Sequence, residues 1–244
     1  MFVRWFHSSR MERKKMKIQS ISHEKGVTLV ELLVALVIAA ITLAGVYRVF
    51  ISQTRSYAVQ DQVVEVQQSV RSAMEIILRD LRMAGFDDDN PTSPYTVPTA
   101  ITTVGSNTIA VNYEYYNRTL NQYERHEVTY AVNGSSQLTR TLNVTAAVLP
   151  VPNPTTEILL DNVGALTFTY GIDSNTDKIM DDQNGDGIIN AADYVAAGAV
   201  GTATVVAIRV ALTGGPNPTN VDVARIVSPR TLVSAVTLRN ICLR

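Results

Sequence analysis

The sequence predicts an α+β protein in which a long N-terminal helix, half in a membrane and half amphipathic, packs on an antiparallel β-sheet. Three observations predict this fold. An apolar run covers residues 27–46, no proline occurs from residue 27 to 84, and period-two alternation begins after Pro91. A long apolar run that continues without a helix breaker indicates one helix, and alternation indicates strands that are buried on one face.

The charge of the chain is unevenly placed. Residues 1–26 carry seven Lys or Arg and two acidic residues, whereas the remaining residues carry 14 basic and 20 acidic groups. A basic block directly before an apolar run is typical of a targeting segment. The positive-inside rule keeps this block in the cytoplasm and places the body outside. We predict four parts: a basic leader 1–26, a transmembrane helix 27–51, an amphipathic continuation 52–85 and a β-rich domain 86–244.

Scarce residue types exclude several functions. The single cysteine, Cys242, rules out an intrachain disulfide and a cysteine-based zinc site. Beyond residue 26 there is one histidine, His126, and one lysine, Lys178. We interpret His126 as a polar strand residue, assign no catalytic residue and do not expect an enzyme. Direct binding of nucleic acid is not expected either, because the body is net acidic.

The apolar run, residues 27–46, is interrupted by one carboxylate. Twenty residues at 1.5 Å each span roughly 30 Å, enough to cross a bilayer as a helix. Glu31 lies inside this run. A carboxylate in hydrocarbon is costly, so it indicates a functional site by default. The alternative is a glutamate whose side chain reaches the membrane surface.

The residues around Glu31 carry a resemblance to a known family. The block is Lys25-Gly26-Val27-Thr28-Leu29-Val30-Glu31-Leu32-Leu33-Val34-Ala35-Leu36. It resembles the class III signal of type IV pilins and pseudopilins, in which glycine precedes a mature helix with glutamate as its fifth residue. Val27 stands where the family usually has phenylalanine. The resemblance implies that a prepilin peptidase cuts between Gly26 and Val27, that Val27 is N-methylated, and that Glu31 pairs with this amine on a neighbouring subunit.

The helix is expected to continue beyond the membrane. Apolar residues recur at spacings of three or four, which gives one stripe that packs on a sheet. Gly85 is the expected C-cap. A coiled coil is the less favoured alternative, because the stripe lasts barely three heptads. The stripe consists of Val59, Val63, Val66, Val70, Met74, Ile77 and Leu81.

The strands are expected after Pro91, where the alternation begins. Asn133-Gly134 is a turn signal between the second and third strand. Together with the helix, they give a pilin-like outline. The seven predicted strands are 108–115, 127–132, 137–141, 156–160, 165–170, 204–211 and 232–238.

Two further stretches, residues 71–86 and 236–240, resemble the PilW group of minor type IV pilins. This resemblance implies a minor pilin in type IV pilus assembly. Its implied partners are other major and minor pilins, the prepilin peptidase, the inner-membrane assembly platform and, before assembly, the lipid bilayer. The implied location is the inner membrane of a Gram-negative bacterium with the body in the periplasm, and then the pilus or pseudopilus. Short leaders are usual in the family, so we expect translation to start at Met11 or Met16.

Two other functions stay open. One is a minor pseudopilin of a type II secretion system. The other is a membrane-anchored calcium-binding protein or enzyme that never enters a filament. Gly26 and Glu31 disfavour the latter, because a plain membrane anchor needs neither.

One motif in the body predicts a calcium site. Oxygen-bearing residues occupy positions 1, 3, 5, 9 and 12 of a calcium-loop template, and glycine occupies position 6. Ile189 is expected to anchor the loop in the core. The loop ends in aspartate, as dockerin-type loops do. The predicted ligands of Ca²⁺ are Asp182, Asn184, Asp186, the Ile188 carbonyl, Asn190 and Asp193.

Two alternatives accompany this motif. The upstream stretch Asp173, Asn175, Asp177 begins a similar pattern but has Lys178 where glycine belongs, so we interpret it as decayed or accessory. A solvated loop rich in Asx turns is the alternative to any metal site.

Overall fold

The computed structural model describes residues 26–88, 91–97, 99–216 and 226–242. The chain divides into two units, with the boundary between Ile51 and Ser52. Apart from Gly26, the predicted leader lies outside the described residues, as do the expected start sites at Met11 and Met16.

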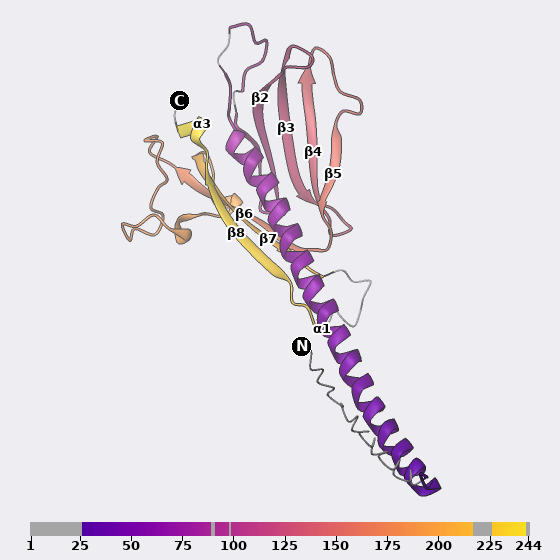
Figure 1. Cartoon of the computed structure of the whole chain (residues 1–244). Helices are drawn as coiled ribbons and strands as arrows, with labels where there is room; N and C mark the ends of the chain where they lie inside the picture. Colours follow the sequence, from indigo (N-terminus) through magenta and orange to yellow (C-terminus); the bar gives the residue numbers. More distant parts are fainter. Residues whose placement is uncertain (1–25, 89–90, 98, 217–225, 243–244) are drawn as a thin grey trace, which may run out of the picture. The chain divides into compact units, whose positions relative to one another are not determined.

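Helix α1 (Leu29–Met83) is 55 residues long and confirms the predicted long helix. Figure 1 shows it without a break. In the first unit, the side chains of residues 29–51 are all exposed. Within the described ranges, α1 is the one helix long and apolar enough to cross a membrane. In the second unit, α1 buries the predicted stripe from Val66 onward.

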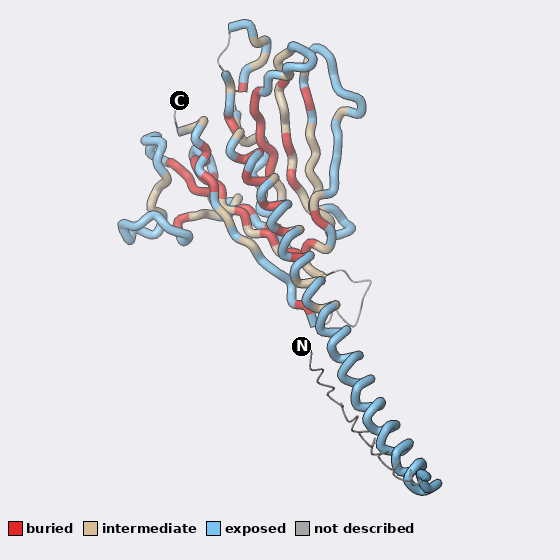
Figure 2. Tube along the Cα trace, in the orientation of Figure 1, coloured by how far each residue is buried: buried red, intermediate tan, exposed pale blue. Residues whose placement is uncertain are grey.

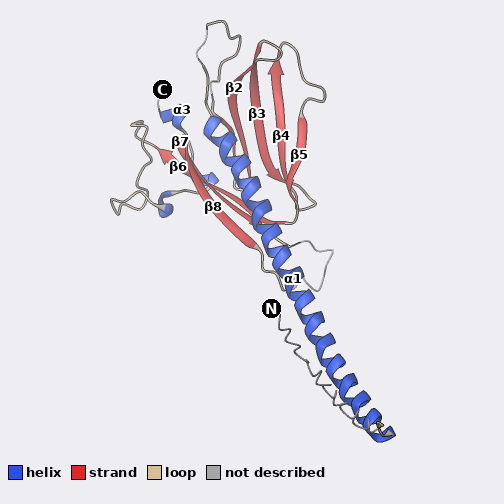
Figure 3. Ribbon diagram, viewed as in Figure 1, coloured by secondary structure: helices blue, strands red, loops and turns tan. Residues whose placement is uncertain are grey.

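In the described residues after α1, eight antiparallel strands form two meander sheets rather than one continuous sheet (Figure 3). In each sheet the strands lie in sequence order. The five-stranded sheet contains β1 (Ile101–Val104), β2 (Thr108–Asn117), β3 (Gln122–Val132), β4 (Leu138–Ala146) and β5 (Thr155–Leu160). The three-stranded sheet contains β6 (Val163–Asp173), β7 (Thr204–Gly214) and β8 (Arg230–Thr237).

The seven predicted strands are confirmed as β2 to β8. The turn at Asn133 and Gly134 is confirmed as well, because the Ser136 N–H donates to the Asn133 carbonyl at 3.1 Å between β3 and β4. β1 was not predicted. It has four residues, Ile-Thr-Thr-Val, too short a stretch for alternation to be recognised.

The hydrophobic core of the second unit lies between α1 and the inner faces of both sheets, as the buried segments in Figure 2 show. One close approach depends on glycine. A Cβ placed on Gly214 of β7 would lie 2.5 Å from a methyl carbon of Val70 on α1. The missing side chain therefore lets the helix approach the strand directly.

The C-terminal end of α1 is closed by residues far away in the sequence. Gly85 has φ +74° and ends the helix, as predicted. Asn240, in the short helix α3 (Arg239–Cys242), donates from Nδ2 to the carbonyl oxygen of Arg82 at 3.1 Å and to that of Ala84 at 3.3 Å. These carbonyls are among those that a helix end leaves without partners.

Candidate functional site

The predicted calcium loop lies between β6 and β7, and Asp182 organises its first half. Asp182 Oδ1 accepts a hydrogen bond from the Gly185 N–H at 2.7 Å, and Oδ2 accepts one from the Gly187 N–H at 2.6 Å. The φ angles of these glycines are +74° and +80°, which glycine adopts without strain. Donation from Gly187 holds the pKa of Asp182 below its ordinary value. Asp182 is therefore a carboxylate at neutral pH.

The other predicted ligands follow along the same loop. Asn184 Oδ1 accepts from the Asp186 N–H at 2.9 Å, and Asp186 Oδ1 accepts from the Ile188 N–H at 2.8 Å. Asn190 Nδ2 donates to the Ile188 carbonyl at 3.0 Å and to Asp186 Oδ2 at 3.3 Å. One amide group thus bridges two of the oxygens predicted to bind Ca²⁺. Within the described part of the chain, no three His, Cys, Asp or Glu side chains are grouped so that they could hold a metal ion.

Asp193 closes the loop from inside the domain. Its side chain is buried, and its two carboxylate oxygens accept from the Gln183 N–H at 3.0 Å and the Asn190 N–H at 2.7 Å. The prediction that Ile189 anchors the loop in the core is wrong, because this side chain is 50% exposed. Buried Asp193 holds the loop instead, since its carboxylate satisfies backbone groups at both ends.

The upstream stretch repeats the bonding of the predicted calcium loop. Asp173 Oδ1 accepts from the Thr176 N–H at 2.7 Å, and Oδ2 accepts from the Lys178 N–H at 2.8 Å. These donors are the fourth and sixth residues, as in the downstream loop. Both Thr176 and Lys178 have φ +67°. Lys178 therefore takes the backbone conformation of the glycine it replaces.

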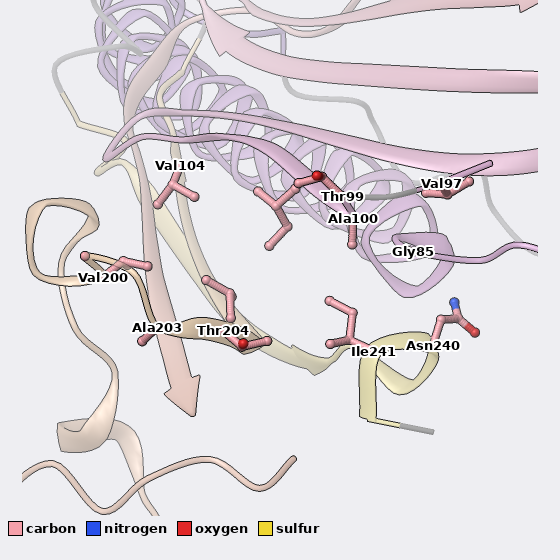
Figure 4. A pocket seen from close by; sticks show the side chains of 13 residues that line it. Gly85, Val97, Thr99, Ala100, Val104, Val200, Ala203, Thr204, Asn240 and Ile241 are labelled. Carbon is pink, nitrogen blue, oxygen red and sulfur yellow. The ribbon is translucent and has the colours of Figure 1, made fainter. Parts of the chain in front are cut away.

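A hollow of about 380 Å³ lies beside the end of α1 (Figure 4). Its walls include Gly85, Ala100 and Val104 on one side and Thr204 and Ile241 on the other. None of its thirteen lining residues has an ionisable side chain. The described residues that line it therefore offer no general acid or base.

His126 lies on β3, in agreement with its interpretation as a strand residue, and β3 begins five residues before the predicted strand 127–132. Its Nε2 is 2.9 Å from Oε2 of the buried Glu124, and its ring centroid lies 5.4 Å from that of Tyr113 and 5.1 Å from that of Tyr115. These contacts give His126 a structural role in holding a buried carboxylate.

The predicted cleavage site lies directly before α1. No heavy atom lies within 4 Å of a Cβ placed on Gly26, and the Val27 side chain is 74% exposed. The neighbouring described residues therefore leave the backbone at this peptide bond open to a peptidase.

Glu31 forms the first turn of α1 together with Thr28. The Thr28 N–H donates to Glu31 Oε2 at 2.9 Å, and the Glu31 N–H donates to Thr28 Oγ1 at 3.2 Å. This reciprocal pair is a capping box, which satisfies two N–H groups at a helix start. Threonine followed three residues later by glutamate is visible in the sequence and is the signal for this role. Glu31 therefore has a local task in addition to the predicted assembly role.

A comparison with protein families finds a match in the segment that contains Gly26, Val27 and Glu31. Residues 21–47 match the family model of the prokaryotic N-terminal methylation motif. The chain carries a type IV pilin-like prepilin signal. No curated protein matches the chain.

The prepilin signal covers the predicted cleavage site, Glu31 and much of the apolar half of α1. It implies processing by a prepilin peptidase and assembly with other pilins. With the long apolar helix, it indicates a membrane-anchored, pilin-like protein of pilus or secretion assembly, which is a structural role.

Proposed function

We propose that this chain is a minor pilin, similar to the PilW group, that is built into type IV pili. The observation that carries the proposal is the prepilin signal at the start of a helix whose second half packs against antiparallel sheets. The two stretches that resemble the PilW group lie in contact, because Asn240 donates to the carbonyl of Arg82. This contact supports the proposal, because both stretches that resemble the PilW group take part in closing the C-terminal end of α1.

Processing is the first step of the proposed function. Cleavage between Gly26 and Val27 creates a positive α-amino group at the start of the apolar helix. Each of two opposite charges is costly in hydrocarbon, and pairing makes both tolerable. Glu31 of one subunit then pairs with the N-methylated amine of Val27 on its neighbour, which selects the register of the helices during assembly.

Intact mass of the membrane-extracted protein tests processing. The expected species begins at N-methylated Val27 and lacks tryptophan, because Trp5 is the only tryptophan in the chain. A protein in purified filaments that still contains residues before Val27 would contradict the proposal.

Substitution of Glu31 tests assembly, and two variants separate its two tasks. Glu31→Gln keeps a side chain that can complete a capping box but removes the charge. Thr28→Ala removes the capping hydroxyl and keeps the charge. We expect Glu31→Gln to be cleaved yet poorly incorporated into filaments, and Thr28→Ala to be incorporated. Equal incorporation of Glu31→Gln and the wild type would refute the charge pairing.

Crosslinking separates the proposed function from its alternatives. A photo-crosslinking amino acid at Leu36, which is 60% exposed, lies in the apolar half of α1. Adducts with pilins of a type IV pilus are expected. Adducts with pseudopilins of a secretion system would favour the type II alternative, and no adduct with either would favour a plain membrane anchor.

We further propose that residues 182–193 bind one Ca²⁺ with a structural role. The loop backbone supports this, because the two glycines with positive φ and the Asx bonds already form a tight turn of oxygen-bearing side chains. Oxygen ligands in a flexible loop favour Ca²⁺ over Zn²⁺ and Mg²⁺. Binding would replace the amide of Asn190 between Asp186 and the Ile188 carbonyl, and would relieve repulsion among the carboxylates.

Thermal melting of the detergent-solubilised full chain tests this calcium proposal. Calcium about tenfold above its dissociation constant would stabilise the fold by roughly 1.4 kcal/mol by mass action. We expect a rise in Tm with millimolar Ca²⁺, a smaller rise with Mg²⁺, and none in Asp182→Asn/Asp186→Asn. Asp61→Asn/Asp161→Asn removes two charges elsewhere and should keep the rise. If Ca²⁺ does not change the Tm of the wild type, the calcium proposal fails and the alternative of a solvated loop without a metal remains.

A further inference from the structure

The four edge strands of the two sheets differ in how they are protected. An open edge presents unpaired backbone N–H and C=O groups, which natural proteins shield with short strands, bulges, prolines or charges. β1 has four residues, and a bulge interrupts its pairing between Ile101 and Thr103. β5 follows Pro152 and Pro154 and carries Glu157. Both edges of the five-stranded sheet thus have such protection.

The outer edge of β6 is covered by backbone from other segments. The Phe168 N–H donates to the Ser106 carbonyl at 2.8 Å. Tyr170 exchanges both of its backbone hydrogen bonds with Val195, at 2.9 and 2.8 Å. The turn between β1 and β2 and the loop before β7 therefore satisfy this edge.

β8 has the least protected edge, because its one charged residue, Arg230, is its first residue. The Leu238 N–H donates to the Val206 carbonyl at 2.8 Å, directly opposite in the register of β7 and β8. Bonded and non-bonded residues alternate along an antiparallel pair, so every second residue of β8 turns its backbone groups away from β7. No Lys, Asp, Glu or Pro occurs from residue 231 to 237. The residues with outward backbone groups are Thr231, Val233, Ala235 and Thr237.

These outward groups are open in the structure. For the ranges that the structure describes, no backbone hydrogen bond from another segment reaches them. Their side chains lie on the exposed face of the sheet, and Val233 is 44% exposed. Among the described residues, the edge therefore presents a continuous run of open donors and acceptors beside apolar and hydroxyl side chains.

Two arginines flank one end of this edge. Arg82 of α1, residues 235–237 of β8 and Arg239 of α3 line a hollow of about 520 Å³. Both side chains are exposed, and neither forms an ion pair with a described residue. Asn240 follows Arg239 in the chain and donates to the backbone carbonyl of Arg82, which holds the backbones that carry the two arginines close together. Within the described residues, the edge thus combines open backbone groups with two nearby positive charges.

We propose that the outer edge of β8 binds, by strand addition, an extended segment of another protein that carries carboxylate side chains. Strand addition uses main-chain hydrogen bonds for affinity and side-chain contacts for specificity. The free edge fits the first requirement, and Arg82 and Arg239 select carboxylates by charge complementarity. This proposal does not depend on whether the partner belongs to a pilus.

A second copy of β8 is the less suitable occupant. Antiparallel pairing of two β8 edges would bring Arg230 at the start of one strand toward Arg239 beyond the end of the other. Like charges placed opposite each other across strands are destabilising. An acidic strand meets no such repulsion.

The test uses the full chain in detergent micelles and a fluorescein-labelled peptide of seven residues, in which three glutamates alternate with valine and threonine. The matched probe has glutamine in place of each glutamate. We expect the acidic peptide to bind at least about threefold more tightly, because exposed ion pairs contribute only modestly. Equal binding of the two peptides, or binding of neither, would overturn the proposal.

Two variants separate strand pairing from general electrostatic attraction. Ala235→Pro removes an outward N–H and should weaken binding by about tenfold or more, whereas Ala235→Val keeps the N–H and should bind as the wild type does. Arg82→Gln/Arg239→Gln should weaken binding of the acidic peptide about threefold to tenfold. The matched control Arg71→Gln/Arg118→Gln removes the same charge elsewhere and should bind the peptide as the wild type does. Weakening by the arginine change with none by Ala235→Pro would overturn strand addition.

Hydrogen exchange on the unsubstituted protein supplies a readout that does not depend on how a variant folds. The acidic peptide should slow amide exchange within residues 230–238 and leave exchange in β5, an edge of the five-stranded sheet, unchanged. Exchange that stays the same in residues 230–238 while the peptide is bound would place the peptide elsewhere and overturn the proposal.

Discussion

Arg140 on β4 donates from Nε to Asp80 Oδ2 on α1 at 2.7 Å. The Tyr130 hydroxyl on β3 donates to the same oxygen at 2.6 Å. Asp80 is buried within the helix face that contacts the core. The five-stranded sheet therefore holds the amphipathic half of α1 through a charged bond as well as through apolar packing. Burial and the negative charge of Asp80 both raise the pKa of Tyr130, so its hydroxyl stays protonated as a donor.

Removal of this carboxylate should strongly destabilise the second unit. Asp80→Ala leaves the guanidinium of Arg140 without its buried partner, which costs about 3–5 kcal/mol for a buried pair. Glu157→Ala is the matched control, because Glu157 accepts from Arg140 Nη1 at 3.0 Å but is exposed and should cost less than about 1 kcal/mol. Urea denaturation followed by circular dichroism measures both. Similar midpoints for the two variants would show that Asp80 does not anchor the helix.

The sequence predicted the parts of this fold that local pattern encodes. The stripe from Val66 to Leu81 identified the buried face of α1 because helical spacing is a local property. The period-two alternation identified seven strands for the same reason. The split into two sheets was not predictable, since it depends on which strand pairs with which. The burial of Asp80 was not predictable either, because its partner Arg140 lies 60 residues away in the sequence.

In the candidate sites, too, features encoded by local sequence were predictable and features that depend on the folded backbone were not. Gly26, Val27 and Glu31 form a contiguous signal, and the sequence was sufficient to recognise it. The calcium loop at Asp182 stays a prediction, and its expected anchor was wrong, because Asp193 is buried and Ile189 is exposed. Burial of a loop residue depends on the path of the backbone, which the ligand pattern does not specify.

The capping of α1 by the C-terminus gives a second prediction. Asn240→Ala removes a donor from the carbonyls of Arg82 and Ala84, and should cost about 1 kcal/mol, the usual net value of one hydrogen bond. Asn240→Asp should cost more, because it brings a carboxylate to the negative end of the helix dipole. In thermal melting, the wild type should therefore have the highest Tm, Asn240→Ala a lower one and Asn240→Asp the lowest. The reverse order of the two variants would show that Asn240 does not act as a cap.

Glu124 gives a prediction about acid stability. Burial raises the pKa of this carboxyl, but hydrogen bonds from His126, Gln122 and Asn117 outweigh that effect, so its pKa lies below the ordinary value. A lowered pKa in the folded state stabilises the fold above the unfolded pKa, and this contribution is lost as pH falls through the folded pKa. Glu124→Gln should therefore be less stable than the wild type at neutral pH and should lose less stability on acidification.

The measurement is the midpoint of urea unfolding at a series of pH values from neutral to about pH 3. Glu65→Gln, a change on the exposed side of α1, should follow the wild-type curve. Parallel curves for Glu124→Gln and the wild type would contradict a lowered pKa at Glu124.

Gly187 gives the last prediction, on the conformation of the calcium loop. A Cβ at Gly187 would meet no atom within 4 Å, so Gly187→Ala adds no clash, yet φ is +80°. The left-handed conformation costs an L-residue roughly 1–2 kcal/mol. Lys178 holds φ +67° at the equivalent place upstream, which indicates that the chain tolerates a side chain there. Gly187→Ala should therefore fold with a slightly lower Tm without calcium.

We expect the calcium-free Gly187→Ala loop to relieve part of this strain by turning φ away from +80°. Binding of Ca²⁺ must then restore the strained turn, which weakens the affinity. A cost of about 1.4 kcal/mol corresponds to a tenfold higher dissociation constant, measured by calcium titration of the full chain in detergent. Gly134→Ala is the matched control, because Gly134 also has free space around its Cβ position but is not among the glycines with positive φ. Gly134→Ala should change neither Tm nor affinity by a comparable amount. An unchanged calcium affinity together with an unchanged Tm in Gly187→Ala would mean that neither state needs the turn that Asp182 forms with the Gly187 N–H, and would remove the backbone support for the proposed site.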